Sequence, residues 1–332
     1  MPSETLDFEE PVALLLKEIE ALRMMAQTPE RIASIARLEA RAQELREEIF
    51  AKLAPWQIVQ VARHANRPCT LDYVERLITD FTEVHGDRRF ADDKAIIAGF
   101  GFYHGESVMV VGHQKGRDTK QKIYRNFGYA KPEGYRKALR VMRLAEKFRR
   151  PILAFIDTPA AYPGIESEER GVAEAIAFNL REMSQLDVPI IVTVCGEGGS
   201  GGALGIAVGD RVLMQEFSVY SVIPPEGCAA ILWRDAKRKV EAASALKITA
   251  PDLLGLGLVD EIIKEPIGGA HLDYAGAARL MDLAINRHLR ELSALTPADR
   301  LNGRYDKFRA MGRLGQAFVE APIPTPVPGR AD

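Results

Sequence analysis

Glycines crowd one short stretch of the sequence, GEGGSGGALG at residues 196–205, where six of the ten residues are glycine. Glycine loses more backbone freedom on folding than any other residue, so this cluster meets a need that side chains would obstruct. The preceding IIVTVC has the pattern of a buried strand, and the following ALGIAVG suggests the start of a helix. Such a strand-to-helix turn exposes unpaired backbone N–H groups that suit a negative oxygen.

Different uses of this turn are compatible with the residues. A dinucleotide-binding turn reads G-x-G-x-x-G, and Gly196, Gly198 and Gly201 fit this spacing, but such a turn usually belongs to the first βα unit and this strand is not the first. A P-loop is excluded because no G-K-[ST] follows. An oxyanion hole, in which N–H groups stabilise charge on a carbonyl oxygen, remains open. A tight turn that only allows close helix packing remains open as well.

Two more loops follow strand-like segments. DTPAAYPG (157–164) follows ILAFI, and VIPPEG (222–227) follows another short apolar run. The carboxyl ends of neighbouring parallel strands meet at one edge of a sheet, where ligands bind. We therefore expect all three loops to border one pocket.

Side chains suited to catalysis are scarce around these loops. The six histidines form no metal-spaced pair, and the sequence has no G-x-S-x-G motif. Ser200 has no evident base partner, and Glu197 is only a weak candidate for an acid. Any chemistry is therefore expected to depend on backbone donors, and no metal is predicted.

Residues 113–150 form a basic segment with 13 Lys or Arg against 3 Asp or Glu. It is densest at Lys115, Arg117, Lys120, Lys122 and Arg125. The segment is either a solvated face or a binding surface for phosphates or an acidic partner.

The elements that position these loops begin with two amphipathic helices over residues 6–50. Apolar residues recur every three or four positions, and Thr28 with Pro29 predicts the cap and first residue of the second helix. A helical hairpin follows, which packs either on its own domain or on another subunit.

A different pattern begins at residue 95. AIIAGFGFY and SVMVVGH predict a β-hairpin, and helices are expected near 132–148, 167–186 and 226–246. Strands are expected at 151–157 and 188–196, so βα units should build a sheet that is covered on both faces. The run from 290 onward is polar, and the proline-rich end (321–332) predicts an extended, disordered tail.

The composition limits the class of protein. With 332 residues, 47% of them hydrophobic, the chain can form one large domain with an appendage. The net charge of -2 disfavours a dedicated nucleic-acid binder. The three cysteines offer no paired framework, and no apolar run has signal-peptide or membrane-spanning character. A cytoplasmic protein is predicted.

Seven motifs in order resemble one protein family. They are FTEVHGDRRFADDKAIIAGFG, KPEGYRKALRVMRLAEKF, FIDTPAAYPG, EERGVAEAIAFNL, GEGGSGGALGI, YSVIPPEGCAAILWRD and EPIGGAHLD. This series is similar to the α subunit of bacterial acetyl-CoA carboxylase carboxyltransferase over roughly residues 6–315. The resemblance implies an α/β, ClpP/crotonase-like fold of repeated ββα units with an N-terminal helical hairpin. It divides the chain into the hairpin (1–55), a biotin-side carboxyltransferase domain (56–315) and the tail (316–332).

The resemblance also implies a reaction and partners. The family transfers a carboxyl group from carboxybiotin to acetyl-CoA, giving malonyl-CoA for fatty acid synthesis. Biotin arrives on the biotin carboxyl carrier protein, and ATP is used by biotin carboxylase, a separate component. A β subunit with a zinc ribbon completes the active site, and the expected assembly is an α2β2 heterotetramer. No metal belongs to this chain, and neither a membrane nor a nucleic acid is an expected partner.

Site residues follow from the same resemblance. The step Gly201, Gly202 and Ala203 is expected to give backbone N–H groups to the ureido oxygen of biotin, so that no side-chain base is required. The surrounding biotin-side residues are expected to be Gly198, Gly199, Ala160, Tyr162, Pro225, Glu226 and Gly227. The basic residues Lys115, Arg117, Lys120, Lys122 and Arg125 are expected to meet substrate phosphates or the carrier.

Two positions depart from the family pattern. Ala160 stands where the family usually has glycine, and Pro224 stands where it usually has serine. Two alternatives also remain: a hydratase or hydrolase of the same fold that acts alone, and a non-catalytic scaffolding subunit.

Overall fold

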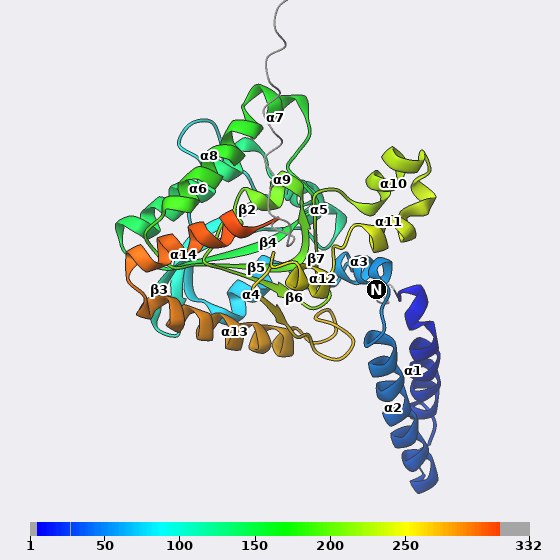
Figure 1. The fold of residues 1–332 in the computed structure, drawn as a ribbon. Helices are drawn as coiled ribbons and strands as arrows, with labels where there is room; N and C mark the ends of the chain where they lie inside the picture. Colours follow the sequence, from blue (N-terminus) through cyan, green and yellow to red (C-terminus); the bar gives the residue numbers. More distant parts are fainter. Residues whose placement is uncertain (1–4, 27, 313–332) are drawn as a thin grey trace, which may run out of the picture.

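A computed structural model describes residues 5–26 and 28–312, which form a sheet with helices on both faces and a projecting helical hairpin (Figure 1). The strands are β1 (Thr79–Glu83), β2 (Ile96–Tyr103), β3 (Glu106–His113), β4 (Ile152–Thr158), β5 (Ile190–Gly199), β6 (Arg211–Gln215), β7 (Val219–Ser221) and β8 (Glu261–Ile263). The helices are α1 (Glu10–Arg23), α2 (Pro29–Phe50), α3 (Pro55–Ala62), α4 (Thr70–Leu77), α5 (Thr119–Tyr124), α6 (Pro132–Lys147), α7 (Ile165–Glu169), α8 (Val172–Gln185), α9 (Ser200–Leu204), α10 (Pro225–Trp233), α11 (Lys239–Ala245), α12 (Ala250–Gly255), α13 (Tyr274–Ala294) and α14 (Pro297–Ala310).

The strand order is β1-β2-β3-β4-β5-β6-β8, and β7 pairs with the end of β5. The pairs β1–β2 and β2–β3 are antiparallel, which confirms the predicted hairpin. All pairs from β3 to β8 are parallel, so the carboxyl ends of β4, β5 and β7 meet at one edge. The order β2, β3, α6 forms one ββα unit of the predicted fold.

Both faces of the central strands β4 and β5 are buried, as their apolar sequences predict. On β4, Ile152, Ala154 and Ile156 belong to a core shared with α6 and α8. Leu153 and Phe155 point to the other face and join a core with α4 and α13. This alternation follows from the two-residue period of a strand, and it explains why β4 is apolar throughout.

The predicted hairpin is present as α1 and α2. The Thr28 hydroxyl accepts a hydrogen bond from the N–H of the third residue of α2, at 3.3 Å, so it caps this helix as expected. At the base of the hairpin, the ring of Phe50 packs edge-on against Phe217 of the body, with centroids 5.5 Å apart. Elsewhere on the hairpin, Leu14 of α1 and Ile32 of α2 are 59% and 56% exposed.

Two helices are shorter than the sequence predicted. The expected helix at 167–186 is divided into α7 and α8, because Gly171 between them has a φ of +76°. The expected helix at 226–246 is divided into α10 and α11 by Arg234, which has a φ of +56°. Left-handed backbone cannot continue a right-handed helix, so both predictions were wrong in length.

Helix α14 was not predicted from the polar run after residue 290. Thr296 caps it by accepting the N–H of Asp299 at 3.2 Å. Its Arg304 is buried and forms two hydrogen bonds to Asp210, both 2.9 Å long. The predicted tail lies outside the described residues, and the domain limits at 55 and 315 stay predictions.

Candidate functional site

The glycine stretch is a strand end followed by a short helix. Strand β5 continues to Gly199, and α9 begins at Ser200. Ser200 makes the turn with a φ of +52°, in the left-handed region. The predicted strand-to-helix turn is therefore present, although the strand extends four residues into the glycine stretch.

Most of these glycines are required by the protein itself. A Cβ at Gly198 would lie 2.6 Å from the Tyr220 ring, and one at Gly205 would lie 2.7 Å from the Tyr135 ring. Cβ atoms at three further glycines would collide with neighbouring groups: at Gly196 with Asp157, at Gly199 with the Pro159 carbonyl, and at Gly202 with the backbone of Ala160 and Ala161. Close internal packing thus explains five of the six glycines.

Gly201 is the exception. A Cβ built on it would meet only one neighbouring atom within 4 Å, Cδ1 of Ile176 at 3.7 Å, and its φ is not positive. Neither packing nor backbone geometry therefore requires glycine at this position. The space beside Gly201 is a pocket.

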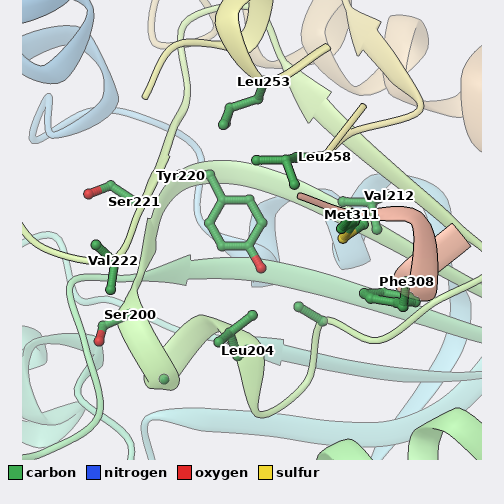
Figure 2. Close-up of a pocket in the computed structure, with 12 residues that line it drawn as sticks. Ser200, Leu204, Val212, Tyr220, Ser221, Val222, Leu253, Leu258, Phe308 and Met311 are labelled. Carbon is green, nitrogen blue, oxygen red and sulfur yellow. The ribbon is translucent and has the colours of Figure 1, made fainter. Parts of the chain in front are cut away.

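This pocket holds about 270 Å³ between α9, β7 and the end of α14 (Figure 2). Its apolar walls come from Leu204, Val212, Val222, Leu253, Leu258, Phe308 and Met311, and its polar side chains are Ser200, Tyr220 and Ser221. None of the described lining residues is Asp, Glu, Lys, Arg or His. An apolar pocket with few polar groups is the usual form of a small-molecule site.

The N–H groups of α9 differ in their availability. Gly201 and Gly202 lie in its first turn, where N–H groups have no partner inside the helix. Ala203 is the fourth helical residue, and helical geometry directs its N–H toward the Gly199 carbonyl. Gly201 and Gly202 are therefore better placed than Ala203 to bind a ligand oxygen.

Two buried side chains hold the helix in place. The Gly202 carbonyl accepts hydrogen bonds from His113 Nε2 and from the Tyr135 hydroxyl, each 3.2 Å long. Burial lowers the pKa of His113 to about 3, so the imidazole is neutral at neutral pH. Fixing this carbonyl also fixes the plane of its peptide bond.

The loop at 157–164 lies against the glycine turn, as predicted. The Thr158 hydroxyl donates to the carbonyl of Gly128 at 2.7 Å or of Ala160 at 2.8 Å. Ala160 does not have a positive φ, so alanine in place of the family's glycine is unstrained. The Tyr162 ring lies under Lys131 Nζ, 4.9 Å from its centroid.

The third loop joins the same edge. A small cleft is lined by Pro159 from the first loop, by Gly198 and Gly199, and by Pro224 and Pro225 at the start of α10. The prediction that three loops converge is therefore confirmed. Pro224 precedes α10 with a φ of −62°, which suits proline, so the departure from serine costs no backbone strain.

A chain of ion pairs lies beneath this edge. Lys115 Nζ is 2.8 Å from both Asp157 Oδ1 and Glu197 Oε2. Arg63 joins Glu197 to Glu226, with N–O distances of 2.6 Å to each. Burial disfavours charge on Glu197, but Lys115 and Arg63 outweigh it and lower the pKa of this carboxyl to about 2. Glu197 is thus held as a carboxylate between two cations.

The five residues of the predicted basic surface differ in their partners. Lys115 is held in the ion-pair chain just described. Arg117 pairs with Asp72, and Arg125 donates to a backbone carbonyl at 2.9 Å. Lys120 and Lys122 lie on α5. The role of these residues as a binding surface stays a prediction.

The part of the chain that the structure describes offers neither a metal cluster nor a membrane-spanning helix. It contains no cluster of three or more His, Cys, Asp or Glu residues able to hold a metal ion. No helix within it is long and apolar enough to cross a membrane.

Several residues at this site were missed from the sequence. Tyr220 and Phe308 line the pocket, and His113 and Tyr135 bind the Gly202 carbonyl. One signal was available for α14, because the Thr-Pro step that starts α2 occurs again at 296–297. The contacts of His113 and Tyr135 join residues 89 and 67 positions apart, which no local pattern reveals.

Comparisons with known proteins agree with this description. The family described as acetyl co-enzyme A carboxylase carboxyltransferase-like matches residues 5–312. The acetyl-coenzyme A carboxylase carboxyl transferase subunit alpha of Geobacter metallireducens is 59% identical over 312 residues, which cover 94% of this chain and 98% of the relative. The protein of the same name from Geobacter sulfurreducens is 61% identical over 270 residues, covering 81% and 85%.

Solved structures share the fold. A 12S transcarboxylase hexamer core has a TM-score of 0.54 at 21% identity, covering 67% of this chain and 42% of its own. A Pseudomonas malonate decarboxylase hetero-tetramer has a TM-score of 0.58 at 15% identity, covering 72% and 94%. The predicted crotonase-like fold is confirmed, and the chain belongs to the family of acetyl-CoA carboxylase carboxyltransferase α subunits.

Proposed function

We propose that this chain is the α subunit of a carboxyltransferase that moves a carboxyl group from carboxybiotin to acetyl-CoA, giving malonyl-CoA. Family membership over nearly the whole chain supports this reaction. The observation that carries the proposed site is the open face of Gly201, which borders an apolar pocket beside first-turn N–H groups.

The residues present fit a biotin head group. Its ring is largely apolar, like the pocket, and it has one ureido oxygen that N–H groups can bind. Carboxybiotin supplies a carboxyl group whose release places negative charge on that oxygen. The N–H groups of Gly201 and Gly202 donate to this oxygen and stabilise the charge. Ala203 contributes by continuing the helix.

The remaining predicted residues form the wall of the site. Gly198, Gly199 and Ala160 pack the loops together, while Tyr162 and the start of α10 (225–227) border the edge. Lys120 and Lys122 are the cations best placed to meet a phosphate, because they have no role in the ion-pair chain.

Proton transfer by this chain is not expected. The pocket has no ionisable side chain other than Tyr220 among its described residues, and Glu197 is held as a carboxylate by two cations. A hydratase or hydrolase acting alone would need an acid or a base here. The geometry therefore disfavours that alternative, and family membership disfavours a scaffolding role.

We propose that partner proteins complete the site. Apolar side chains stand exposed near it: Leu204, Val222, Ile231 and Leu232 are 42%, 75%, 71% and 66% exposed. Exposed apolar residues of this kind are typical of a surface that another protein covers. The proposed partners are a zinc-ribbon β subunit in an α2β2 assembly, the biotin carboxyl carrier protein and biotin carboxylase, in the cytoplasm.

The test is a reconstitution. We would purify the full α chain and its β partner, then measure malonyl-CoA decarboxylation with free biotin for each chain and for the mixture. Activity in the mixture alone is the expected result. Activity of the α chain by itself would favour the stand-alone enzyme, and an inactive mixture would contradict the proposal.

A further inference from the structure

Tyr220 occupies a position in the pocket that the glycine turn creates. It lies on β7 directly opposite Gly198 of β5 in the parallel register. Its ring lies so close to Gly198 that any Cβ there would lie 2.6 Å from the ring. The Tyr220 backbone is held as well, since its N–H donates to the Ile248 carbonyl at 3.1 Å. The ring therefore packs against Gly198 from a segment whose backbone is hydrogen-bonded.

The hydroxyl of Tyr220 projects into the pocket, toward the side that Leu204 lines (Figure 2). Across the described residues, no hydrogen bond to this hydroxyl is found. Tyr220 is half-buried and packs against the core, and its hydroxyl is available to a ligand that enters the pocket. Burial raises the pKa of Tyr220 to about 12, which keeps the phenol protonated and able to donate.

The other polar side chains of the pocket are less suitable. The Ser221 hydroxyl is already bonded to the backbone of Ile223, both as donor and as acceptor. Ser200 lies at the turn itself, at the edge of the pocket (Figure 2). The Tyr220 hydroxyl is thus the polar group that reaches into the apolar interior.

We propose that Tyr220 is a biotin-binding residue whose hydroxyl donates a hydrogen bond to the ureido oxygen of the biotin head group in this pocket. The inference rests on the proposed function, because it assumes the same ligand beside Gly201. It adds a side-chain contact to the backbone contacts and assigns the pocket between α9 and α14 to the biotin ring. A compact apolar ring with an oxygen at its edge matches this lining.

The test is Tyr220→Phe in the full α chain, assembled with the β subunit. This change removes one oxygen and keeps the ring against Gly198, so the melting temperature should stay within about 2 °C of the wild type. The matched control is Tyr103→Phe. This change also removes a tyrosine hydroxyl, but at the end of β2, where Tyr103 donates to Asp282 of α13 at 2.7 Å.

Two measurements decide the outcome. Binding of free biotin to the complex, followed by ligand-observed NMR, should weaken about fivefold to tenfold, the effect of one lost hydrogen bond. In malonyl-CoA decarboxylation, the KM for biotin should rise by a similar factor while the KM for malonyl-CoA stays unchanged. The Tyr103→Phe complex should match the wild type in both.

Failure of this inference differs from failure of the proposed function. A wild-type complex that is active, together with unchanged biotin binding in Tyr220→Phe, would overturn the role of Tyr220 alone. A raised KM for malonyl-CoA with an unchanged KM for biotin would also overturn it, because the pocket would then hold the acyl substrate. A wild-type complex with neither activity nor biotin binding would overturn both.

Discussion

At the scale of single residues, the glycines of one turn have different tasks. Gly202 is pressed against the backbone of Ala160 and Ala161, whereas Gly201 faces the pocket. The change from glycine to alanine at each of these two positions can therefore separate an effect on packing from an effect on ligand binding.

Gly201→Ala should fold normally and impair catalysis. The added methyl group meets only Ile176, at 3.7 Å, and alanine is favoured in a helix, so stability should be unchanged or slightly higher. Because Gly201 lines the pocket proposed for biotin, the KM for biotin should rise about tenfold or more, which corresponds to about 1.4 kcal/mol of lost binding. Steady-state decarboxylation by the α–β complex measures this effect.

Gly202→Ala is the matched comparison. Its methyl group would overlap the backbone of Ala160 and Ala161, and overpacking of this kind costs about 1–3 kcal/mol. Urea unfolding of the isolated α chain measures the loss. Equal destabilisation by Gly201→Ala and Gly202→Ala would contradict the inference that Gly201 has free space beside it.

Tyr135→Phe should alter the geometry of α9 without touching the ligand. It removes one of two hydrogen bonds to the Gly202 carbonyl and should cost about 1 kcal/mol of stability. Because the carbonyl then depends on His113 alone, kcat should fall while the KM for malonyl-CoA is unchanged. Tyr73→Phe, which loses a 2.9 Å bond to Gln215 in the other core, should lose similar stability at full kcat. Equal kcat values in the two variants would contradict a positioning role for Tyr135.

At the scale of elements, the ion-pair chain joins segments that carry the site. Arg63 follows α3, Lys115 follows β3, Asp157 lies on β4, Glu197 on β5 and Glu226 on α10. Removing one partner of a buried pair leaves the other charge uncompensated, so this chain should matter for how the loops are held.

Glu197→Gln should destabilise the chain in a pH-dependent way. The pKa of Glu197 is about 2 in the folded chain against a usual value of 4.5. Its carboxylate therefore stabilises the fold fully above pH 4.5, by on the order of 3 kcal/mol, and this contribution disappears as the pH falls toward 2. Urea unfolding of both chains at several pH values should show a difference that is largest at pH 7 and narrows below 4.5. The exposed Glu241→Gln is the control, and a difference that stays constant down to pH 3 would contradict the lowered pKa.

At the scale of the whole molecule, the hairpin α1–α2 projects from the body (Figure 1). Its base is anchored through Phe50 and Phe217, but Leu14 on α1 and Ile32 on α2 are exposed. This combination favours a contact with another subunit over packing on the chain's own domain.

The double change Leu14→Ser with Ile32→Ser should leave the isolated α chain folded, with a melting temperature within about 2 °C, because both side chains are exposed. Association with the β subunit should weaken about tenfold or more, measured by sedimentation of the mixture. Leu283→Ser on α13, at an equally exposed site of 59%, is the control. Unchanged association would place the subunit contact elsewhere.

Local patterns in the sequence determined much of this architecture. Apolar periodicity predicted the helical hairpin, the β2–β3 hairpin and α6. An element that buries one face repeats its apolar residues every second position in a strand and every third or fourth position in a helix, and this repeat is visible in the sequence. The order of strands and loops was enough to predict that 157–164, the glycine turn and 222–227 meet at one edge. The breaks at Gly171 and Arg234 were missed, since a positive φ at a single residue leaves little trace in such patterns.

Only the tertiary structure distinguished the glycines that are needed for packing from the one that lines the pocket. The sequence shows six equivalent glycines, yet the neighbours that distinguish them, Tyr135, Asp157 and Tyr220, come from distant segments. The same is true of Glu197, whose pKa depends on Lys115 and Arg63, 82 and 134 positions away. Periodicity records which face of an element is buried, but contacts between elements are set by the packing of the whole chain. For this reason the sequence determined where the three loops of the candidate site meet, and the tertiary structure decided which of its glycines is open to the pocket.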